Sequence, residues 1–327
     1  MANVAGSTDI LPLYAELAKS TALPIPKGKK VVIHVDINQT IVPVDAVQQK
    51  GASDVVAHAF AKSMRYPWKK DIVPMTYHDF VFNVDVPGPR SDKALKKQRK
   101  QKAIHFIDYL ETRQLAFAPQ VRTTYEVALK MIAASSLESR RVVPSFYRLI
   151  ETLQRDGVEF TIILRSFGTE VNAVAKELKE NTGIAFRRGS FEAHLFQDAE
   201  KETPHLLGQS EAYKLFQQDS WAVQDEWGYW NSHEEQFQYG KPFPFCLSPD
   251  VHSIFFDDNI FPSDAPTNIV CPYDLADHHY GDIDDLTRRS ILVPVDLIAT
   301  IFDPHYFINH VARSLTFSEI KEKEATA

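Results

Sequence analysis

Short, continuous runs of apolar residues recur along the chain and predict strands that are buried on both faces. The first run, Val31–Val35, leads directly into Asp36. Similar runs are found at Phe160–Leu164, Ser253–Phe256, Asn268–Val270 and Ile291–Val295. Apolar runs without alternation are typical of parallel sheets, whose strands are covered on both sides. The pattern therefore indicates a parallel sheet.

Amphipathic patterns with helical spacing separate several of these runs. Pro144–Asp156 and Thr169–Glu180 carry apolar residues at helical intervals, and the first ends at Asp156-Gly157, a helix stop. Strands that alternate with helices build sheets covered by helices on both faces. The chain is therefore expected to contain a Rossmann-like, doubly wound α/β core.

A long segment interrupts this core after its first strand. More than a hundred residues separate the first two buried runs, far more than one crossover requires. The segment contains helical patterns near 45–65, 92–115 and 122–138, with an irregular aromatic and proline-rich part over 66–89. We interpret it as a mostly helical insertion.

These patterns divide the chain into four parts. The expected parts are an N-terminal helical extension over 1–28 (with a short helix at 9–20), an α/β core over 29–45 and 140–315, a helical insertion over 46–139, and a flexible charged tail over 316–327.

Composition and charge narrow the class of protein. The 327 residues include 36 Lys and Arg against 43 Asp and Glu, giving a net charge of −7, which argues against nucleic-acid binding. Two cysteines are too few for a disulfide framework. No apolar run reaches the roughly 18 residues of a membrane span, and the N-terminus lacks the basic and apolar regions of a signal peptide. We therefore expect a cytoplasmic protein with no membrane contact.

Polar residues cluster at or beside the carboxyl ends of the predicted strands, where open parallel sheets bind their ligands. In chain order these are Asp36, Asn38 and Thr40 after the first strand, Ser166 after the second, Lys241 within Gly240-Lys241-Pro242, and the pair Asp257-Asp258. Adjacent carboxylates repel each other unless a cation or donor compensates, so the acidic pair suggests a metal site.

Together these motifs resemble the haloacid-dehalogenase-like hydrolase superfamily, most of whose members are Mg²⁺-dependent phosphatases. The family pattern is a strand with Asp-x-Asp-x-Thr, a second strand with Ser or Thr, a Lys, and a third strand with an acidic pair. The resemblance implies that the insertion is a C1-type cap. It also implies a phosphoric monoester hydrolase acting on a small phosphorylated substrate.

The resemblance assigns four residues to the metal and the nucleophile. Asp36 would attack the phosphoryl group to form an aspartyl-phosphate, with its other oxygen on Mg²⁺. Asp257 or Asp258 would complete the acidic metal site, and the backbone carbonyl of Asn38 would be a further ligand. The metal offsets the repulsion between the anionic phosphoryl group and the carboxylate.

Three further residues would bind the substrate or stabilise charge. Thr40 and Ser166 would contact the substrate, with Ser166 donating a hydrogen bond to a phosphoryl oxygen. Lys241 would supply positive charge to the nucleophile and the transition state. Lys201 or Lys214 could replace it in this role.

Asn38 departs from the family pattern, which has at this position the Asp that serves as general acid and base. A carboxamide does not titrate, and loss of such catalysis typically costs about 10²–10⁴ in rate. Three interpretations follow: a slow or selective phosphatase, an enzyme whose acid comes from His78 or His105 in the insertion, or a catalytically impaired binding or regulatory protein that retains metal and phosphate binding. A dehalogenase fits less well, because it has no use for the acidic metal site.

Other features have simpler explanations. The basic run over 93–102 is expected to be a solvated helix face, with substrate steering as the alternative. His34, inside the first strand, is expected to be a core residue with its hydrogen bonds satisfied. The aromatic cluster over 221–230 is expected to pack, and the segment 277–285, rich in Asp and His, lacks the ligand spacing of a zinc site.

Overall fold

The computed structural model describes residues 14, 16–44, 51–89, 92–137, 140–201, 205–265 and 267–326. Contacts divide the chain into two compact units. Unit 1 comprises Met1–Ser20, Pro43–Val143 and Asp296–Pro304, and unit 2 comprises Thr21–Val42, Pro144–Val295 and His305–Ala327. The segment Asp296–Pro304, which lies within the range expected for the core, thus groups with unit 1.

Unit 2 is built on an eight-stranded sheet with the order β13-β10-β1-β4-β8-β5-β6-β7. Its strands are β1 (Lys30–Asp36), β4 (Phe160–Ser166), β5 (Arg187–Glu192), β6 (Leu195–Asp198), β7 (Leu206–Leu207), β8 (Trp221–Gln224), β10 (Val251–Asp257) and β13 (Leu292–Pro294). The pairings from β13 to β5 are parallel, whereas β6 and β7 add antiparallel strands at one edge. The predicted α/β class with a mostly parallel sheet is confirmed, as is the helical stretch after the first strand.

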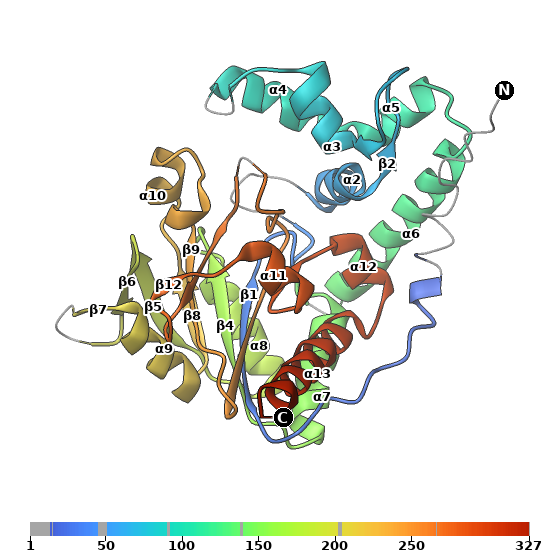
Figure 1. Ribbon diagram of the computed structural model, residues 1–327. Helices are drawn as coiled ribbons and strands as arrows, with labels where there is room; N and C mark the ends of the chain where they lie inside the picture. The colour runs from blue at the N-terminus through green and yellow to red at the C-terminus, as the bar shows by residue number, and fades with distance from the viewer. Residues whose placement is uncertain are drawn as a thin grey trace. The chain divides into compact units, whose positions relative to one another are not determined.

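Helices of unit 2 pack on both faces of this sheet (Figure 1). Unit 2 contains the helices α7 (Pro144–Arg155), α8 (Val171–Thr182), α9 (Gln209–Gln218), α10 (Trp227–Ser232), α11 (Ile283–Arg288) and α13 (Tyr306–Thr326), and the 3₁₀ turn η2 (Phe237–Tyr239). Helices α7 and α13 lie side by side, and Phe307 of α13 packs edge-on against Phe256 of β10. On the opposite face, Phe216 of α9 packs edge-on against His34 of β1.

A second, three-stranded sheet in unit 2 has the order β12-β11-β9. Its strands are β9 (Lys241–Phe245), β11 (Val270–Asp274) and β12 (His279–Tyr280). The predicted strand at Asn268–Val270 thus begins only at Val270, and it pairs with β9 outside the main sheet. A buried apolar cluster that includes Phe243, Phe255 and Leu292 joins the second sheet to the main one.

Unit 1 is mostly helical. Its elements are α2 (Ala52–Ser63), β2 (Arg65–Tyr66), β3 (Met75–Thr76), α3 (Tyr77–Phe80), the π-helical turn η1 (Val81–Asp85), α4 (Lys93–Ile104), α5 (Phe106–Thr112), α6 (Ala118–Leu137) and α12 (Leu297–Phe302). Its aromatic core centres on Trp68, whose ring contacts Tyr77 and Phe106 edge-on and whose Nε1 donates to the Met75 carbonyl at 2.8 Å. The aromatic part of the insertion, expected to be irregular, therefore contains a hairpin and a helical turn.

The basic run on α4 is not a uniformly solvated face. Arg99 is buried and donates hydrogen bonds to the carbonyls of Val86, Gly88 and Pro89. Its guanidinium group also lies 5.1 Å from the centre of the Phe82 ring. The prediction of a solvated face is wrong for Arg99. Three backbone carbonyls of the preceding loop require hydrogen-bond donors, and one guanidinium group can supply several donors at once.

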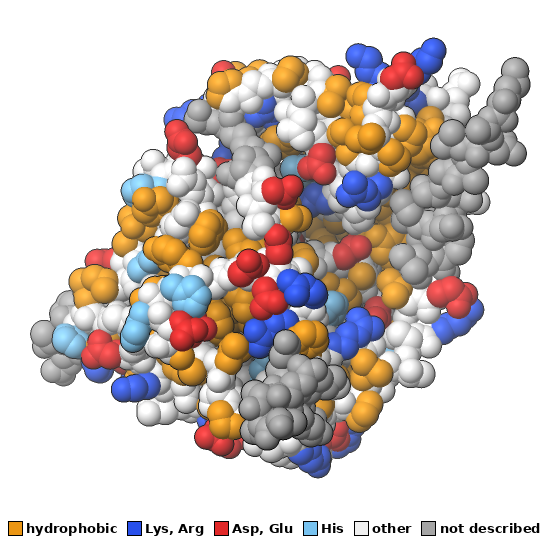
Figure 2. Space-filling model, in the orientation of Figure 1, with side chains coloured by type: hydrophobic (Ala, Val, Ile, Leu, Met, Phe, Trp, Pro, Cys, Tyr) orange, Lys and Arg blue, Asp and Glu red, His pale blue; other side chains and the backbone are white. Residues whose placement is uncertain are grey.

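Two predictions concern the ends of the chain. The helix predicted at 9–20 falls largely outside the described residues, and α13 runs through the range predicted as a flexible tail as far as Thr326. Among the described residues no helix is both long and apolar enough to cross a membrane. Acidic and basic side chains are interspersed on the face drawn in Figure 2.

The buried His252 on β10 predicts a pH-dependent loss of stability. Its Nε2 lies 2.7 Å from the Ser314 hydroxyl of α13, and burial lowers its pKa from 6.5 to about 4. The imidazole therefore stabilises the fold above pH 6.5, and this contribution is lost as the pH falls from 6.5 towards 4. Between pH 7 and pH 5 this single group should cost about 2 kcal/mol of unfolding free energy.

Urea unfolding of the wild type and of His252→Gln at both pH values measures this cost. The wild type should lose about 2 kcal/mol more than the variant between the two pH values. Equal losses in the two proteins would show that the His252 imidazole is not held neutral in the folded state.

Candidate active site

Asp36 ends β1, and a tight turn follows it immediately. The amides of Ile41 and Val42 donate to the Ile37 carbonyl at 3.0 and 2.9 Å, and Gln39 adopts a left-handed conformation with φ of 64°. Such a conformation is unfavourable for a residue other than glycine and is characteristic of functional turns. The turn directs Thr40 back towards the strand, where its hydroxyl donates to Asp36 Oδ2 at 3.1 Å.

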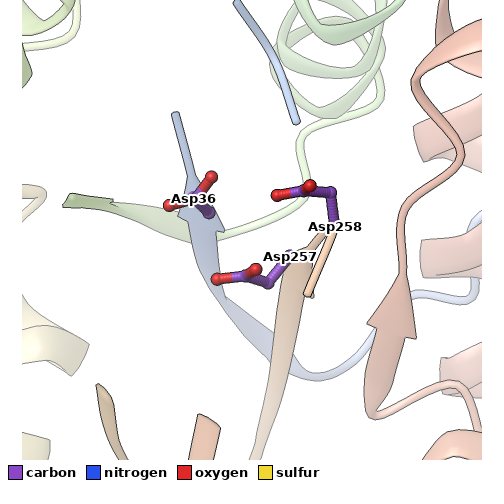
Figure 3. A group of neighbouring side chains, drawn as sticks. All are labelled: Asp36, Asp257 and Asp258. Atoms are coloured by element: carbon purple, nitrogen blue, oxygen red, sulfur yellow. The ribbon is translucent and has the colours of Figure 1, made fainter. Parts of the chain in front are cut away.

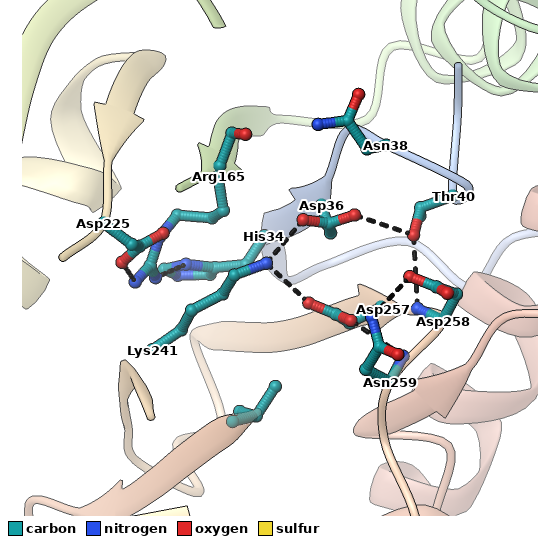
Figure 4. Close-up of polar contacts among 12 residues, drawn as sticks. His34, Asp36, Asn38, Thr40, Arg165, Asp225, Lys241, Asp257, Asp258 and Asn259 are labelled. Atoms are coloured by element: carbon teal, nitrogen blue, oxygen red, sulfur yellow. Dashed lines mark hydrogen bonds and ion pairs between the residues drawn. The ribbon is translucent and has the colours of Figure 1, made fainter. Parts of the chain in front are cut away.

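Lys241 reaches Asp36 from the second sheet. Its Nζ donates to Asp36 Oδ1 at 2.5 Å and to Asp257 Oδ2 at 2.7 Å, and its side chain is only 1% exposed (Figure 4). The preceding residue, Gly240, packs against backbone so closely that a Cβ atom would lie 2.3 Å from the Ile269 carbonyl oxygen. Glycine is therefore required where the chain delivers the lysine.

Asp36, Asp257 and Asp258 form an acidic triad that could hold a metal ion (Figure 3). One carboxylate oxygen from each lies within 4.8 Å of the others. The three carboxylates outnumber the one ammonium group of Lys241, which contacts Asp36 and Asp257. A hard divalent cation such as Mg²⁺ takes oxygen ligands and would balance this charge, so the donor set fits the expected metal.

Backbone and side-chain donors hold the acidic pair in place. The Asn259 amide donates to Asp257 Oδ1 at 2.9 Å, and Asn259 Nδ2 donates to Asp258 Oδ1 at 2.9 Å. The Asp258 amide donates to the Thr40 hydroxyl at 3.2 Å, which connects the turn after β1 to the end of β10. Thr40 therefore links Asp36 to the acidic pair.

Burial perturbs the pKa values of Asp36, Asp257 and Lys241. It raises the pKa of Asp36 well above its ordinary value; Lys241 opposes this shift, and Asp257 and Asp258 add to it. The pKa of Asp257 is raised for the same reasons. Burial alone would lower the pKa of Lys241, but Asp257 and Asp36 raise it above its ordinary value, so this lysine stays charged.

Ser166 and Asn38 meet at a residue that the sequence did not single out. Asn38 Nδ2 donates to Glu170 Oε1 at 2.6 Å, and the Ser166 hydroxyl donates to the same oxygen. Glu170 immediately precedes α8. Nothing in its local sequence distinguishes it from an ordinary residue at a helix start, where acidic side chains are common.

A buried ion pair lies beside the site on the same face of the sheet. Arg165 of β4 and Asp225, just after β8, are both essentially inaccessible and form a bidentate pair (Figure 4). Arg165 Nη1 donates to the Pro242 carbonyl at 2.8 Å, and the guanidinium group lies 4.9 Å from the centre of the Phe191 ring. Arg165 therefore ties β9, next to Lys241, to the main sheet. The sequence contained a signal for this ion pair, because an arginine inside an apolar strand requires a polar or acidic partner.

None of the contacts described above involves the alternative residues. Lys201 and Lys214 are exposed. His78 and His105 belong to unit 1. The ring of His78 stacks on that of Phe82, and His105 Nδ1 lies 3.5 Å from Asp108 Oδ2.

His34 is buried as expected, but its hydrogen bonding is incomplete. Its Nδ1 lies 3.3 Å from Arg165 Nη1, whereas its Nε2 has no hydrogen-bond partner within the described part of the chain. Burial and the nearby Arg165 charge lower its pKa well below the ordinary value, which keeps the ring neutral. The prediction of a satisfied histidine was therefore wrong for Nε2. The ring packs against the aromatic rings of Phe243 and Phe255.

The two remaining features have structural roles. Trp221 is fully buried in the core, and Trp230 stacks on Phe167, while Trp227 stays half exposed. In the segment 277–285, Asp282 caps α11 by accepting from the Asp285 amide. Over the described ranges the acidic triad is the one group of three or more possible metal ligands.

Comparison with known proteins gives no assignment. No protein-family model, curated protein or solved structure matches this chain.

The buried ion pair between Arg165 and Asp225 predicts strong coupling. Arg165→Met or Asp225→Asn alone should each lower the unfolding free energy by about 3–5 kcal/mol, because each leaves a buried group without its partner. The double variant should lose clearly less than the sum of the two. Lys176→Met breaks an exposed contact to Glu180 at 3.8 Å and should cost at most about 1 kcal/mol.

Urea unfolding of the two single variants, the double variant and the Lys176→Met control measures these costs. Strictly additive losses for Arg165 and Asp225 would contradict the assignment of the pair as a coupled unit.

Proposed function

We propose that the chain is a Mg²⁺-dependent phosphohydrolase that acts on a small phosphorylated substrate through an aspartyl-phosphate on Asp36. The proposal includes a doubly wound, Rossmann-like core and a C1-type helical cap, as in the haloacid-dehalogenase-like superfamily. The observation that carries it is the convergence of Asp36, Lys241 and Asp257 at the ends of separate strands. One buried ammonium group contacts both carboxylates there.

In this proposal Asp36 is the nucleophile. A carboxylate oxygen attacks phosphorus, the bond from phosphorus to the leaving-group oxygen breaks, and water later releases phosphate from the aspartyl-phosphate. Thr40 holds Asp36 Oδ2 by a hydrogen bond and so fixes the orientation of the carboxylate. Lys241 supplies positive charge beside the attacking group in a site that excludes much of the water.

Asp36, Asp257, Asp258 and the backbone carbonyl of Asn38 would hold the metal. Bound Mg²⁺ supplies Lewis-acid stabilisation of the phosphoryl charge. The Asn259 side chain and amide keep the acidic pair aligned for this role.

Asn38 limits the range of leaving groups. Its carboxamide cannot transfer a proton to the leaving oxygen, so alkyl phosphates, whose leaving groups need one, should react slowly. Aryl and acyl phosphates, whose leaving groups depart as anions, should react faster. Asn38 is also the observation that favours the second candidate function, a binding or regulatory protein that retains metal and phosphate binding without turnover.

Turnover measurements test the proposal. The wild type should hydrolyse para-nitrophenyl phosphate only with Mg²⁺, and Asp36→Asn should abolish this activity because it removes the nucleophile. Asn38→Asp should accelerate hydrolysis of ethyl phosphate by about 10²–10⁴, and that of the aryl ester by much less, because only the alkyl leaving group needs a proton.

The exposed Asp277 provides a matched control, since Asp277→Asn makes the same change away from the site. Its activity should equal that of the wild type. Mg²⁺ binding without turnover in the wild type would instead support the binding protein. Turnover that survives Asp36→Asn would refute the assigned nucleophile.

A further inference from the structure

Glu170 places a carboxylate where two predicted site residues, Asn38 and Ser166, converge. Its Oε1 accepts from Asn38 Nδ2 at 2.6 Å and from the Ser166 hydroxyl. Glu170 occupies the N-cap position of α8, but its side chain accepts no hydrogen bond from the first turn of the helix. Its contacts are therefore directed at the site rather than at the helix.

The single hydroxyl proton of Ser166 is committed to Glu170. The Ser166 oxygen already accepts from the Gly168 amide at 3.0 Å, and a serine has only one proton to donate. A phosphoryl oxygen can receive that proton only when Glu170 gives it up. The Glu170 carboxylate thus competes with an incoming phosphoryl group for this donor.

Glu170 also adds negative charge to an acidic site. It is a fourth carboxylate, which lies outside the triad of Asp36, Asp257 and Asp258 and is connected to Asp36 through its hydrogen bond to Asn38, two residues further along the chain. Within the described ranges, no lysine, arginine or histidine forms an ion pair with Glu170, and its Oε2 accepts no hydrogen bond. A charged group that lacks a cationic partner favours a ligand that brings one.

We propose that Glu170 is a specificity-determining residue that favours phosphate esters carrying a cationic nitrogen close to the phosphoryl group. This inference rests on the proposed function. The ligand's ammonium group takes the place of the two donors that Glu170 releases. Ser166 and Asn38 then become available to the phosphoryl oxygens, and the added positive charge offsets the fourth carboxylate.

Two phosphonates of matched shape test the inference without turnover, because their carbon–phosphorus bond offers no oxygen leaving group. In 2-aminoethylphosphonate an ammonium group stands where propylphosphonate has a methyl group. Titration calorimetry with Mg²⁺ present should show about tenfold tighter binding of the aminated ligand to the wild type. Glu170→Gln should remove that preference and should bind propylphosphonate about tenfold more tightly than the wild type does.

The control Glu180→Gln removes the same charge from an exposed position on the same helix, and it should keep the wild-type preference. Equal binding of the two phosphonates to the wild type, a preference that survives Glu170→Gln, or no binding of either ligand would each overturn the inference.

Titration with Mg²⁺ alone separates this inference from the proposed function. The wild type and Glu170→Gln should bind the metal, and Asp257→Asn should not. If the metal titration behaves in this way and the phosphonates do not discriminate, only the role of Glu170 fails. If the wild type binds no Mg²⁺, or Asp257→Asn binds it equally well, the proposed function fails.

Discussion

The arrangement of the site depends on a single buried ammonium group. Removing a lysine from water costs several kcal/mol unless carboxylates compensate, and Lys241 meets two of them, Asp36 and Asp257. Neither carboxylate is stable alone at that depth, because burial raises the pKa of both. The three groups are therefore mutually dependent. Three features position the lysine: the pairing of β9 in the second sheet, the close packing at Gly240, and the hydrogen bond from Arg165 to the Pro242 carbonyl.

The charges around this centre point to a site that is completed by ligands. The three carboxylates of the acidic triad outnumber the one lysine, which suits a divalent cation, and Glu170 adds a further carboxylate in contact with Ser166 and Asn38. The Asn38 side chain thus has a role of its own, because its amide group donates a hydrogen bond to Glu170. An acid at this position would repel Glu170 unless one of the two were protonated. An asparagine at position 38 and a glutamate at position 170 are therefore consistent with each other in this structure.

The sequence correctly predicted the strands whose apolar residues form continuous runs and are buried on both faces of the sheet. The runs ending at Asp36, Ser166 and Asp257 are strands buried on both faces, so apolar continuity identified them and placed their polar ends at one edge. Strands β5 to β8 were missed because they are short or carry alternating polar residues. Glu170 and Asp225 could not be found in this way, because their roles arise from contacts between segments distant in sequence or from a helix start with no distinctive motif.

Reductive trapping shows directly whether an aspartyl-phosphate forms on the carboxyl group of Asp36. The protein would be incubated with acetyl phosphate and Mg²⁺ and then treated with sodium borohydride, which reduces an acyl phosphate to an alcohol. Peptide mass spectrometry then identifies the modified residue. The account predicts conversion of Asp36 to homoserine that requires Mg²⁺. Reduction at another carboxylate, or none at Asp36 while phosphate is released, would contradict it.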